Sequence, residues 1–166
     1  MKKHRNLMQQ ICSLDNLYEA ADKAAKGKRK NPEVVAFYEN IDANLLKIQQ
    51  LLLSGKFKTS KYHLFTIYEP KERIIYKLPF YPDRIVHHAI MNVLEPIWVK
   101  IFTSNTYACI KNRGIHAVNR KLIRDLHDIK GTEYCLKLDI KKFYPNIDHT
   151  ILKLIIRQKI ADNKLL

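Results

Sequence analysis

The chain has 166 residues, of which 46% are hydrophobic and 28% charged, and its 30 Lys and Arg against 16 Asp and Glu give a formal net charge of +14. This length corresponds to one domain, or to one domain with part of another. The many aromatic and aliphatic residues exclude an intrinsically disordered chain, and no apolar run reaches the roughly 18 residues of a membrane span. The first residues are polar rather than a secretory signal, and three scattered cysteines, Cys12, Cys109 and Cys135, indicate reduced thiols of the cytoplasm.

The positive charge exceeds what solubility requires and favours a polyanionic partner, with nucleic acid as the first expectation. A solvated or ribosomal-type basic surface and an acidic protein partner are the alternatives. Basic residues are spread along the chain, and the dense run contains Lys28, Arg29 and Lys30. Taken alone, that run is equally typical of a solvated loop or linker.

Two helices are predicted in the first 60 residues. Apolar residues at steps of three and four predict an amphipathic helix from Leu7 to Ala25, which the cluster around Gly27 ends. The tripeptide at 31–33 then supplies an N-cap, a proline and an acid for a second helix. Its apolar stripe runs from Val34 to Leu52.

From Lys61 onward, the spacing of apolar residues changes from the three or four positions of a helix to the two positions of a strand. Residues 62–68 and 73–78 are rich in aromatic and β-branched side chains, and the turn at 69–72 joins them into a predicted β-hairpin with a basic tip. Asp83 is expected to cap the next helix, which Pro96 should interrupt. The adjacent histidines at 87 and 88 are expected to point in two directions, which favours packing or solvent over a metal site.

The C-terminal third contains the most informative element. After an irregular segment at 105–114 and a predicted helix at 115–127, residues 134–140 alternate between apolar and polar and predict a strand that ends near Asp139. A turn at 143–146 and a helix from about Asp148 follow. The expected fold class is therefore α+β.

Five segments in the same order resemble the reverse transcriptases of bacterial retroelements, most closely those of diversity-generating retroelements. The segments are Asp15–Ala20 with Lys26–Lys28, Glu69–Arg73 with Ile75, Asp83–Ala89 with Leu94–Pro96, Tyr107–Cys109 with Arg113–Ala117, and Leu138–Tyr144 with Ile147–His149. The resemblance implies an incomplete right-hand polymerase fold. Its parts would be an N-terminal helical extension (1–60), fingers with a β-hairpin and helices (61–130), and the first strand and helix of the palm (131–166).

The resemblance also implies roles for single residues in the palm. Asp139 resembles the first metal-binding aspartate, and the backbone carbonyl of Ile140 would add a ligand for two Mg²⁺ ions that activate the primer 3′ hydroxyl. Tyr144 resembles the aromatic steric gate that meets a ribose 2′-hydroxyl. Phe143 is its neighbour in the implied nucleotide site. Without the resemblance, an aspartate at a strand end is typical of a turn, and Tyr144 of core packing.

In the fingers, Arg73 resembles the residue that clamps the nucleotide triphosphate, with Lys71 as a helper, because a guanidinium binds phosphate oxygens bidentately. The alternative for Arg73 is a solvated hairpin tip. Arg113 and Lys111 lie in a basic loop and are candidate nucleic-acid contacts, together with the basic run at 28–30.

The chain also departs from the resembled family. Ile110 stands where many relatives have an arginine, and no Asp-Asp dipeptide occurs in the 166 residues, so the Tyr-x-Asp-Asp segment of a second palm strand is missing. One aspartate cannot hold two close metal ions. We therefore expect the N-terminal part of an RNA-directed DNA polymerase that is inactive alone. A natural truncation and an incomplete reading of a longer gene are both compatible with this.

The whole enzyme would act in the cytoplasm, away from membranes, and copy an RNA template into cDNA from a DNA primer and deoxynucleotide triphosphates. The resemblance further implies a small basic accessory protein. The alternative function is a non-catalytic nucleic-acid-binding module that retains the basic fingers and lacks the chemistry.

Overall fold

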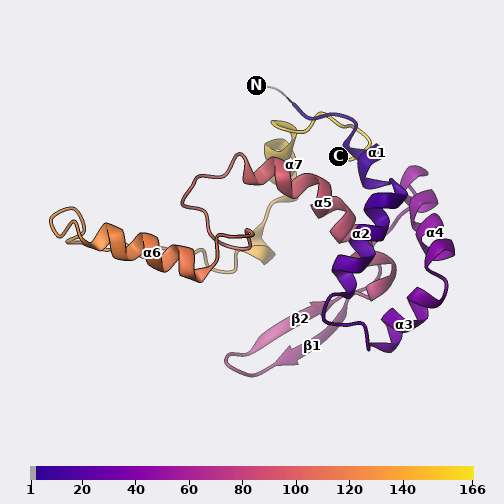
Figure 1. Ribbon diagram of the computed structural model, residues 1–166, viewed down its shortest axis with the longest axis horizontal. Helices are drawn as coiled ribbons and strands as arrows, with labels where there is room; N and C mark the ends of the chain where they lie inside the picture. Colours follow the sequence, from indigo (N-terminus) through magenta and orange to yellow (C-terminus); the bar gives the residue numbers. More distant parts are fainter. Residues whose placement is uncertain (1–2) are drawn as a thin grey trace. The chain divides into compact units, whose positions relative to one another are not determined.

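The computed structural model describes residues 3–166, which form two compact units (Figure 1). Unit 1 contains the chain up to Pro96 together with Ile156–Leu166, and unit 2 contains Ile97–Ile155. Helices and one two-stranded sheet make up the secondary structure, in agreement with the expected α+β class. The division of the chain at 60 and 130, which follows the resembled family, remains a prediction.

The first predicted helix is two helices, α1 (Leu7–Ile11) and α2 (Leu14–Ala25). The break falls at Ser13, whose backbone is extended and whose hydroxyl accepts a hydrogen bond from the Asn16 N–H at 3.3 Å. Serine at an N-cap satisfies a backbone donor that a continuous helix would have bonded itself. The prediction of a single helix over this segment was therefore wrong.

The second predicted helix is likewise divided, into α3 (Pro32–Glu39) and α4 (Ile41–Leu53). Asn31 caps α3 as expected, because its side chain accepts the Glu33 N–H at 3.0 Å. The division lies at Asn40, whose φ of −135° and ψ of 45° are not helical. The hydrophobic period continues across Asn40, and for that reason the sequence pattern did not reveal the break.

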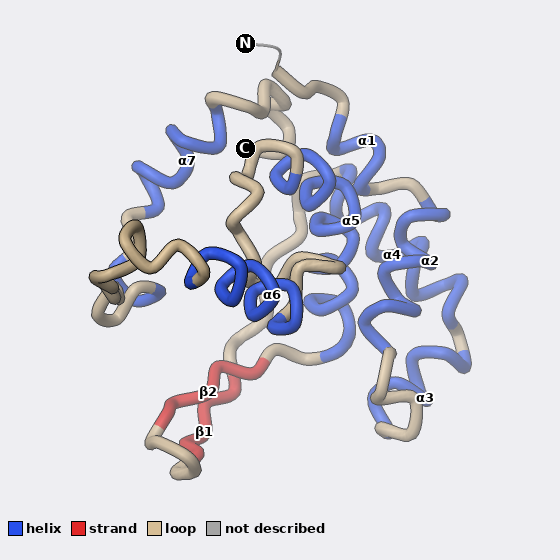
Figure 2. Tube along the Cα trace, turned by 60° about the vertical axis from the view of Figure 1, so that its left-hand side comes forward, coloured by secondary structure: helices blue, strands red, loops and turns tan. Residues whose placement is uncertain are grey.

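The core of unit 1 lies among α2, α3, α4 and the start of α5 (Ile85–Val99) (Figure 2). Leu17, Leu45 and Ile85 are fully buried within it. The rings of Phe37 and Phe80 pack edge to face with centroids 5.3 Å apart. Burial of such apolar side chains is the main stabilising contribution to a small domain.

The predicted hairpin is confirmed as strands β1 (His63–Ile67) and β2 (Arg73–Lys77), which pair antiparallel. Phe65 lies opposite Ile75 in the register. In Figures 1 and 2 the hairpin extends away from the helices of unit 1. Most of its side chains are exposed, which leaves both faces accessible to a ligand.

Asp83 does not cap the helix that follows it. Residues Phe80–Arg84 lead into α5 with a non-helical backbone at Tyr81 (φ −111°, ψ 133°), and no N–H of α5 among the described residues donates to the Asp83 side chain. The buried carboxylate instead accepts the Ser60 N–H at 2.9 Å, which fixes the segment leading to the hairpin.

Helix α5 continues through Pro96 to Val99, so the expected interruption at this proline is not seen. One proline removes a single hydrogen bond and bends a helix more readily than it ends one.

Unit 2 contains α6 (Ile115–Leu126), the 3₁₀ turn η2 (Tyr144–Asn146) and most of α7 (His149–Arg157), which confirms the predicted helices and turn. The predicted strand at 134–140 is not formed. A strand requires a partner for its backbone N–H and C=O groups, and no other segment of residues 3–166 pairs with this one. Its apolar row is open to solvent, with Tyr134 88% and Leu136 81% exposed.

No helix in the described part of the chain combines the length and the apolar character needed to cross a bilayer.

Candidate functional site

The predicted nucleotide clamp lies on the hairpin. Arg73 begins β2 opposite Ile67, and Lys71 lies in the turn between the strands. Both side chains are exposed, and neither forms an ion pair with a carboxylate of residues 3–166. Lys71 and Arg73 alternate with Glu69 and Glu72 along the chain, so the tip carries no net charge, and an anionic ligand would have to compete with these two carboxylates.

The basic run at 28–30 connects α2 to α3. Arg29 is held in place by an ion pair with Asp22 at 2.9 Å, and its guanidinium lies 5.6 Å from the centre of the Tyr38 ring. Burial and the hydrogen bond to Asp22 raise the pKa of Tyr38. Lys28 and Lys30 are exposed and form no ion pair with the described carboxylates, so they are the accessible cations of this run.

The basic loop before α6 uses its arginine internally. Arg113 is half-buried, and one guanidinium nitrogen donates to the carbonyls of Thr103 and Thr106 at 3.1 and 3.3 Å. Lys111 in the same loop is exposed. Arg113 therefore stabilises the loop. Only its remaining N–H groups can donate hydrogen bonds to a template backbone.

The predicted catalytic aspartate is exposed. Asp139 lies in the unpaired segment 134–140, and it forms no hydrogen bond or ion pair with the part of the chain that the structure describes. Asp148, the next carboxylate, is engaged by α7: its side chain accepts the N–H groups of Ile151 and Thr150, which lower its pKa. Asp148 is therefore a helix cap.

The oxygen ligands of Asp139 and Ile140 do not complete a site for two Mg²⁺ ions. Magnesium requires near-octahedral oxygen coordination, in which carboxylates are the main protein ligands. Residues 3–166 contain no group of three or more His, Cys, Asp or Glu side chains that could hold a metal ion. One carboxylate of Asp139 and the carbonyl of Ile140 fall short of the predicted ligand set, and no chemical step can be derived from them alone.

The aromatic pair after Asp139 faces solvent. The rings of Phe143 and Tyr144 pack edge to face with centroids 5.3 Å apart, and Tyr144 is 83% exposed. This exposure excludes packing of Tyr144 into a core formed by the described residues. Its role as a steric gate remains a prediction.

The sequence-predicted residues are distributed over both units. Asp139, Ile140 and the aromatic pair belong to unit 2, as do Arg113 and Lys111. The hairpin cations and the basic run belong to unit 1.

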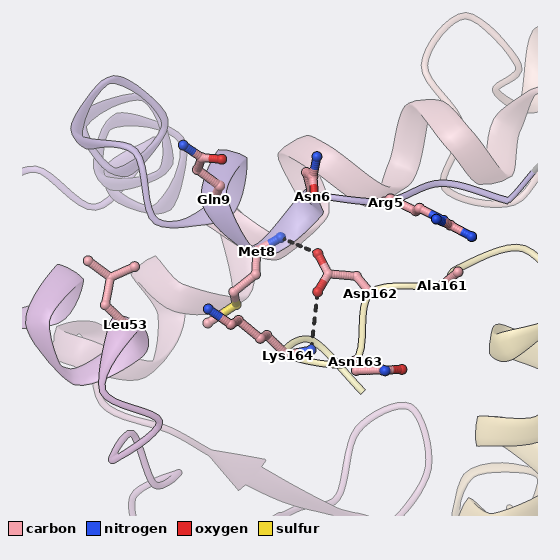
Figure 3. A pocket seen from close by; sticks show the side chains of 9 residues that line it. All are labelled: Arg5, Asn6, Met8, Gln9, Leu53, Ala161, Asp162, Asn163 and Lys164. Carbon is pink, nitrogen blue, oxygen red and sulfur yellow. Dashed lines mark hydrogen bonds between the residues drawn. The ribbon is translucent and has the colours of Figure 1, made fainter.

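A cavity of about 810 Å³ lies where the two ends of unit 1 meet (Figure 3). Asp162 is its central carboxylate, and both oxygens are occupied: one accepts the Met8 N–H at 2.9 Å and the other the Lys164 N–H at 3.1 Å. The Met8 N–H is the main cause of the lowered pKa of Asp162. A carboxylate bound in this way joins α1 to the C-terminal segment, which is a structural role.

A second cavity, of about 320 Å³, lies at the base of the hairpin and was missed in the sequence. We call it the hairpin-base pocket, and it is lined by Tyr62, Tyr76, Leu78, Arg84, His87 and His88. Both His87 and His88 line this pocket, and His87 also lines a further cavity with Val86 and Ile90, so the expected difference in their directions stays a prediction. The spacing of Arg84, His87 and His88 at i, i+3 and i+4 was the available signal, since such residues share one helix face.

Comparison with known proteins gives distant similarities, and no family model matches the chain. The chain is 26% identical over 91 residues to protein YkfC of Escherichia coli and 27% identical over 88 residues to the group II intron-encoded protein LtrA of Lactococcus lactis. It is 24% identical over 88 residues to nuclear intron maturase 1 of Arabidopsis thaliana. These similarities support a reverse-transcriptase-like family. They do not support the diversity-generating type.

Each similarity covers about half of this chain, from 53% to 54%, and a small part of the relative. The matched segment is 24% of YkfC, 14% of LtrA and 12% of the maturase. The chain thus spans a minor fraction of the length of these relatives.

Proposed function

We propose that this chain is an RNA-binding part of a reverse-transcriptase-like protein of the intron-encoded kind. The observation that carries the proposal is the similarity over half of the chain to a group II intron-encoded protein and an intron maturase, whose names link them to introns. The assignment to diversity-generating retroelements rests on the five sequence segments alone, and the similarities to known proteins do not support it.

The charge distribution supports an RNA partner. Lys23, Arg29 and Lys121 pair with carboxylates of the described residues. The 30 Lys and Arg exceed the 16 Asp and Glu, so the formal net charge of +14 cannot be balanced by carboxylates of this chain. A surface of this kind concentrates a polyanion, and each phosphate contact releases counterions.

For a longer protein that contains this chain, we propose the residue roles that follow from the resemblance. Asp139 and the Ile140 carbonyl would contribute to a magnesium site, Tyr144 and Phe143 would contact the incoming nucleotide, and Arg73 with Lys71 would hold its phosphates. RNA template, DNA primer and deoxynucleotides are the implied partners. The incomplete donor set around Asp139 supports the further expectation that the 166-residue chain is inactive by itself.

The non-catalytic nucleic-acid-binding module derived from a reverse transcriptase is the second candidate. Primer extension on an RNA template with Mg²⁺ and deoxynucleotides separates the two candidates. We expect no product from the 166-residue chain. Product above a no-enzyme control that disappears in Asp139→Ala would establish catalysis and overturn the module reading.

RNA binding itself is tested by fluorescence anisotropy with a labelled single-stranded RNA at several salt concentrations. We expect the logarithm of the affinity to fall linearly with the logarithm of salt, with a loss of at least about tenfold between 50 and 200 mM. The double variant Lys28→Gln with Lys30→Gln should make the affinity depend less steeply on salt. The control variant Lys121→Gln should change this dependence less, because Lys121 is already paired with Asp125 at 2.5 Å. Affinity that does not respond to salt would contradict the proposal.

A further inference from the structure

The hairpin-base pocket lies entirely within unit 1. Tyr62 precedes β1, Tyr76 is in β2, and the basic side chains come from the turn before α5 and its first turn. Its volume of about 320 Å³ is within the range of small-ligand pockets. None of the sequence-predicted site residues lines it.

The pocket is positively charged without an opposing carboxylate in its lining. Burial lowers the pKa of His88, and the nearby basic groups of Arg84, Lys23, His87 and Lys28 lower it further. Lys23 is partly compensated by Glu19 at 2.8 Å. The neighbouring carboxylate of Asp83 is buried and does not line the pocket; one of its oxygens accepts the Ser60 N–H, and the other has no hydrogen-bond partner among the described residues. An anion is the ligand that such a cluster lacks.

Arg84 has an unused donor. Its Nε is buried and has no hydrogen-bond partner among the described residues, and the guanidinium forms no ion pair with their carboxylates. A buried donor without an acceptor is unfavourable, and buried polar groups in folded proteins are nearly always paired. Arg84 also lines the pocket, and phosphate oxygens accept from the N–H groups of a guanidinium in a bidentate arrangement.

The aromatic side of the pocket suits a nucleotide rather than a simple ion. The rings of Tyr62 and Tyr76 pack edge to face with centroids 5.9 Å apart, and the two residues are 50% and 61% exposed. Exposed aromatic rings beside cations are the arrangement on which bases of single-stranded nucleic acids stack.

We propose that the hairpin-base pocket binds the phosphate group of a nucleotide, with Arg84 pairing with the phosphate oxygens and the two tyrosines beside the base. The phosphate belongs either to the RNA of the proposed function, on which this part of the inference rests, or to a free nucleotide. Neither source requires Arg73, so this is a second anion site, separate from the predicted triphosphate clamp.

The test measures binding of three probes to the full 166-residue chain: inorganic phosphate and uridine monophosphate by calorimetry, and the labelled RNA by anisotropy. The variants are Arg84→Gln and His87→Gln, with Arg120→Gln as a control because Arg120 is an exposed arginine of α6. We expect Arg84→Gln to weaken binding by about tenfold or more, since it removes charge-assisted hydrogen bonds, and the control to change it little.

The outcomes separate the sources of the phosphate. Weaker binding of RNA alone assigns the site to the RNA backbone, and weaker binding of uridine monophosphate or phosphate assigns it to a free nucleotide. Unchanged binding of all three probes relative to Arg120→Gln overturns the inference, even if RNA binding stays salt-dependent and the proposed function survives.

If Arg84→Gln does not fold, His87→Gln and Tyr62→Leu decide, because both alter exposed side chains of the pocket. Loss of binding in these two variants supports the site. Wild-type binding in both, for all three probes, overturns it.

Discussion

Units 1 and 2 are built from similarly apolar sequence, yet they differ in what they bury. Leu17, Leu45 and Ile48 of unit 1 are fully buried, whereas Ile115, Leu136 and other large apolar residues of unit 2 are mostly exposed, Leu136 at 81%. Amphipathic helices gain stability by covering their apolar faces. An amphipathic pattern is therefore enough to form a helix locally. The helix stabilises the fold only where another part of the protein covers its apolar face.

The largest expected difference between the units is in the cost of removing an apolar side chain. Leu45→Ala empties a fully buried position and should lower the free energy of unfolding by about 2–5 kcal/mol. Leu136→Ala changes an 81% exposed side chain and should stay within about 0.5 kcal/mol. Urea unfolding of both variants measures this. Equal losses would show that the row at 134–140 is covered in solution.

The next largest effect concerns the ends of unit 1. Asp162→Ala removes the acceptor of the Met8 and Lys164 N–H groups and should destabilise the chain by about 1–3 kcal/mol. Asn163→Ala, an exposed neighbour, is the matched control. A melting temperature equal to that of the control would mean that the C-terminal segment does not stabilise unit 1.

Helix caps provide a comparison of intermediate size. Ser13→Ala removes the cap of α2 in the packed unit and should lower the stability by about 1 kcal/mol, visible as a lower melting temperature. Asp148→Ala removes the cap of α7, which is exposed over most of its length. It should reduce helical circular dichroism without moving the main transition. A shift of that transition in Asp148→Ala would indicate that α7 unfolds together with the core.

The smallest expected effect is the response to mild acid. Because burial and nearby cations lower the pKa of His88, the unfolded state binds more protons, and stability should fall as the pH drops through about 6.5. His88→Gln should flatten this dependence, whereas His116→Gln, an exposed histidine of α6, should not. Parallel slopes for the two variants would exclude His88 as the cause.

Asp162 acts in a lower pH window. Its pKa lies below the ordinary value because it accepts backbone N–H groups. The stabilisation it provides is therefore present above that ordinary value and is lost as the pH falls through the folded pKa. The two groups can be distinguished by the pH at which stability declines.

Several elements were determined by local sequence. The hairpin was predicted because both strands and the turn at 69–72 lie within one short segment, so the pairing partner is always close. Helix α7 was predicted from its apolar period and from Asp148, which accepts N–H groups two and three residues ahead. The uncompensated positive charge is likewise a property of composition.

Other features were decided by tertiary structure. Segment 134–140 has the alternation of a strand but no partner in residues 3–166, and a strand exists only when another segment accepts and donates its backbone hydrogen bonds. Asp83 binds the N–H of Ser60, which is 23 residues away and cannot be inferred from helix-capping patterns. The hairpin-base pocket is lined by residues of the hairpin and of α5, which only the folded chain brings together. The Nε of Arg84 has no hydrogen-bond partner among the described residues because no acceptor is packed beside it. Period and capping are local and can be predicted from sequence, whereas pairing and burial depend on distant segments that only the folded chain brings together.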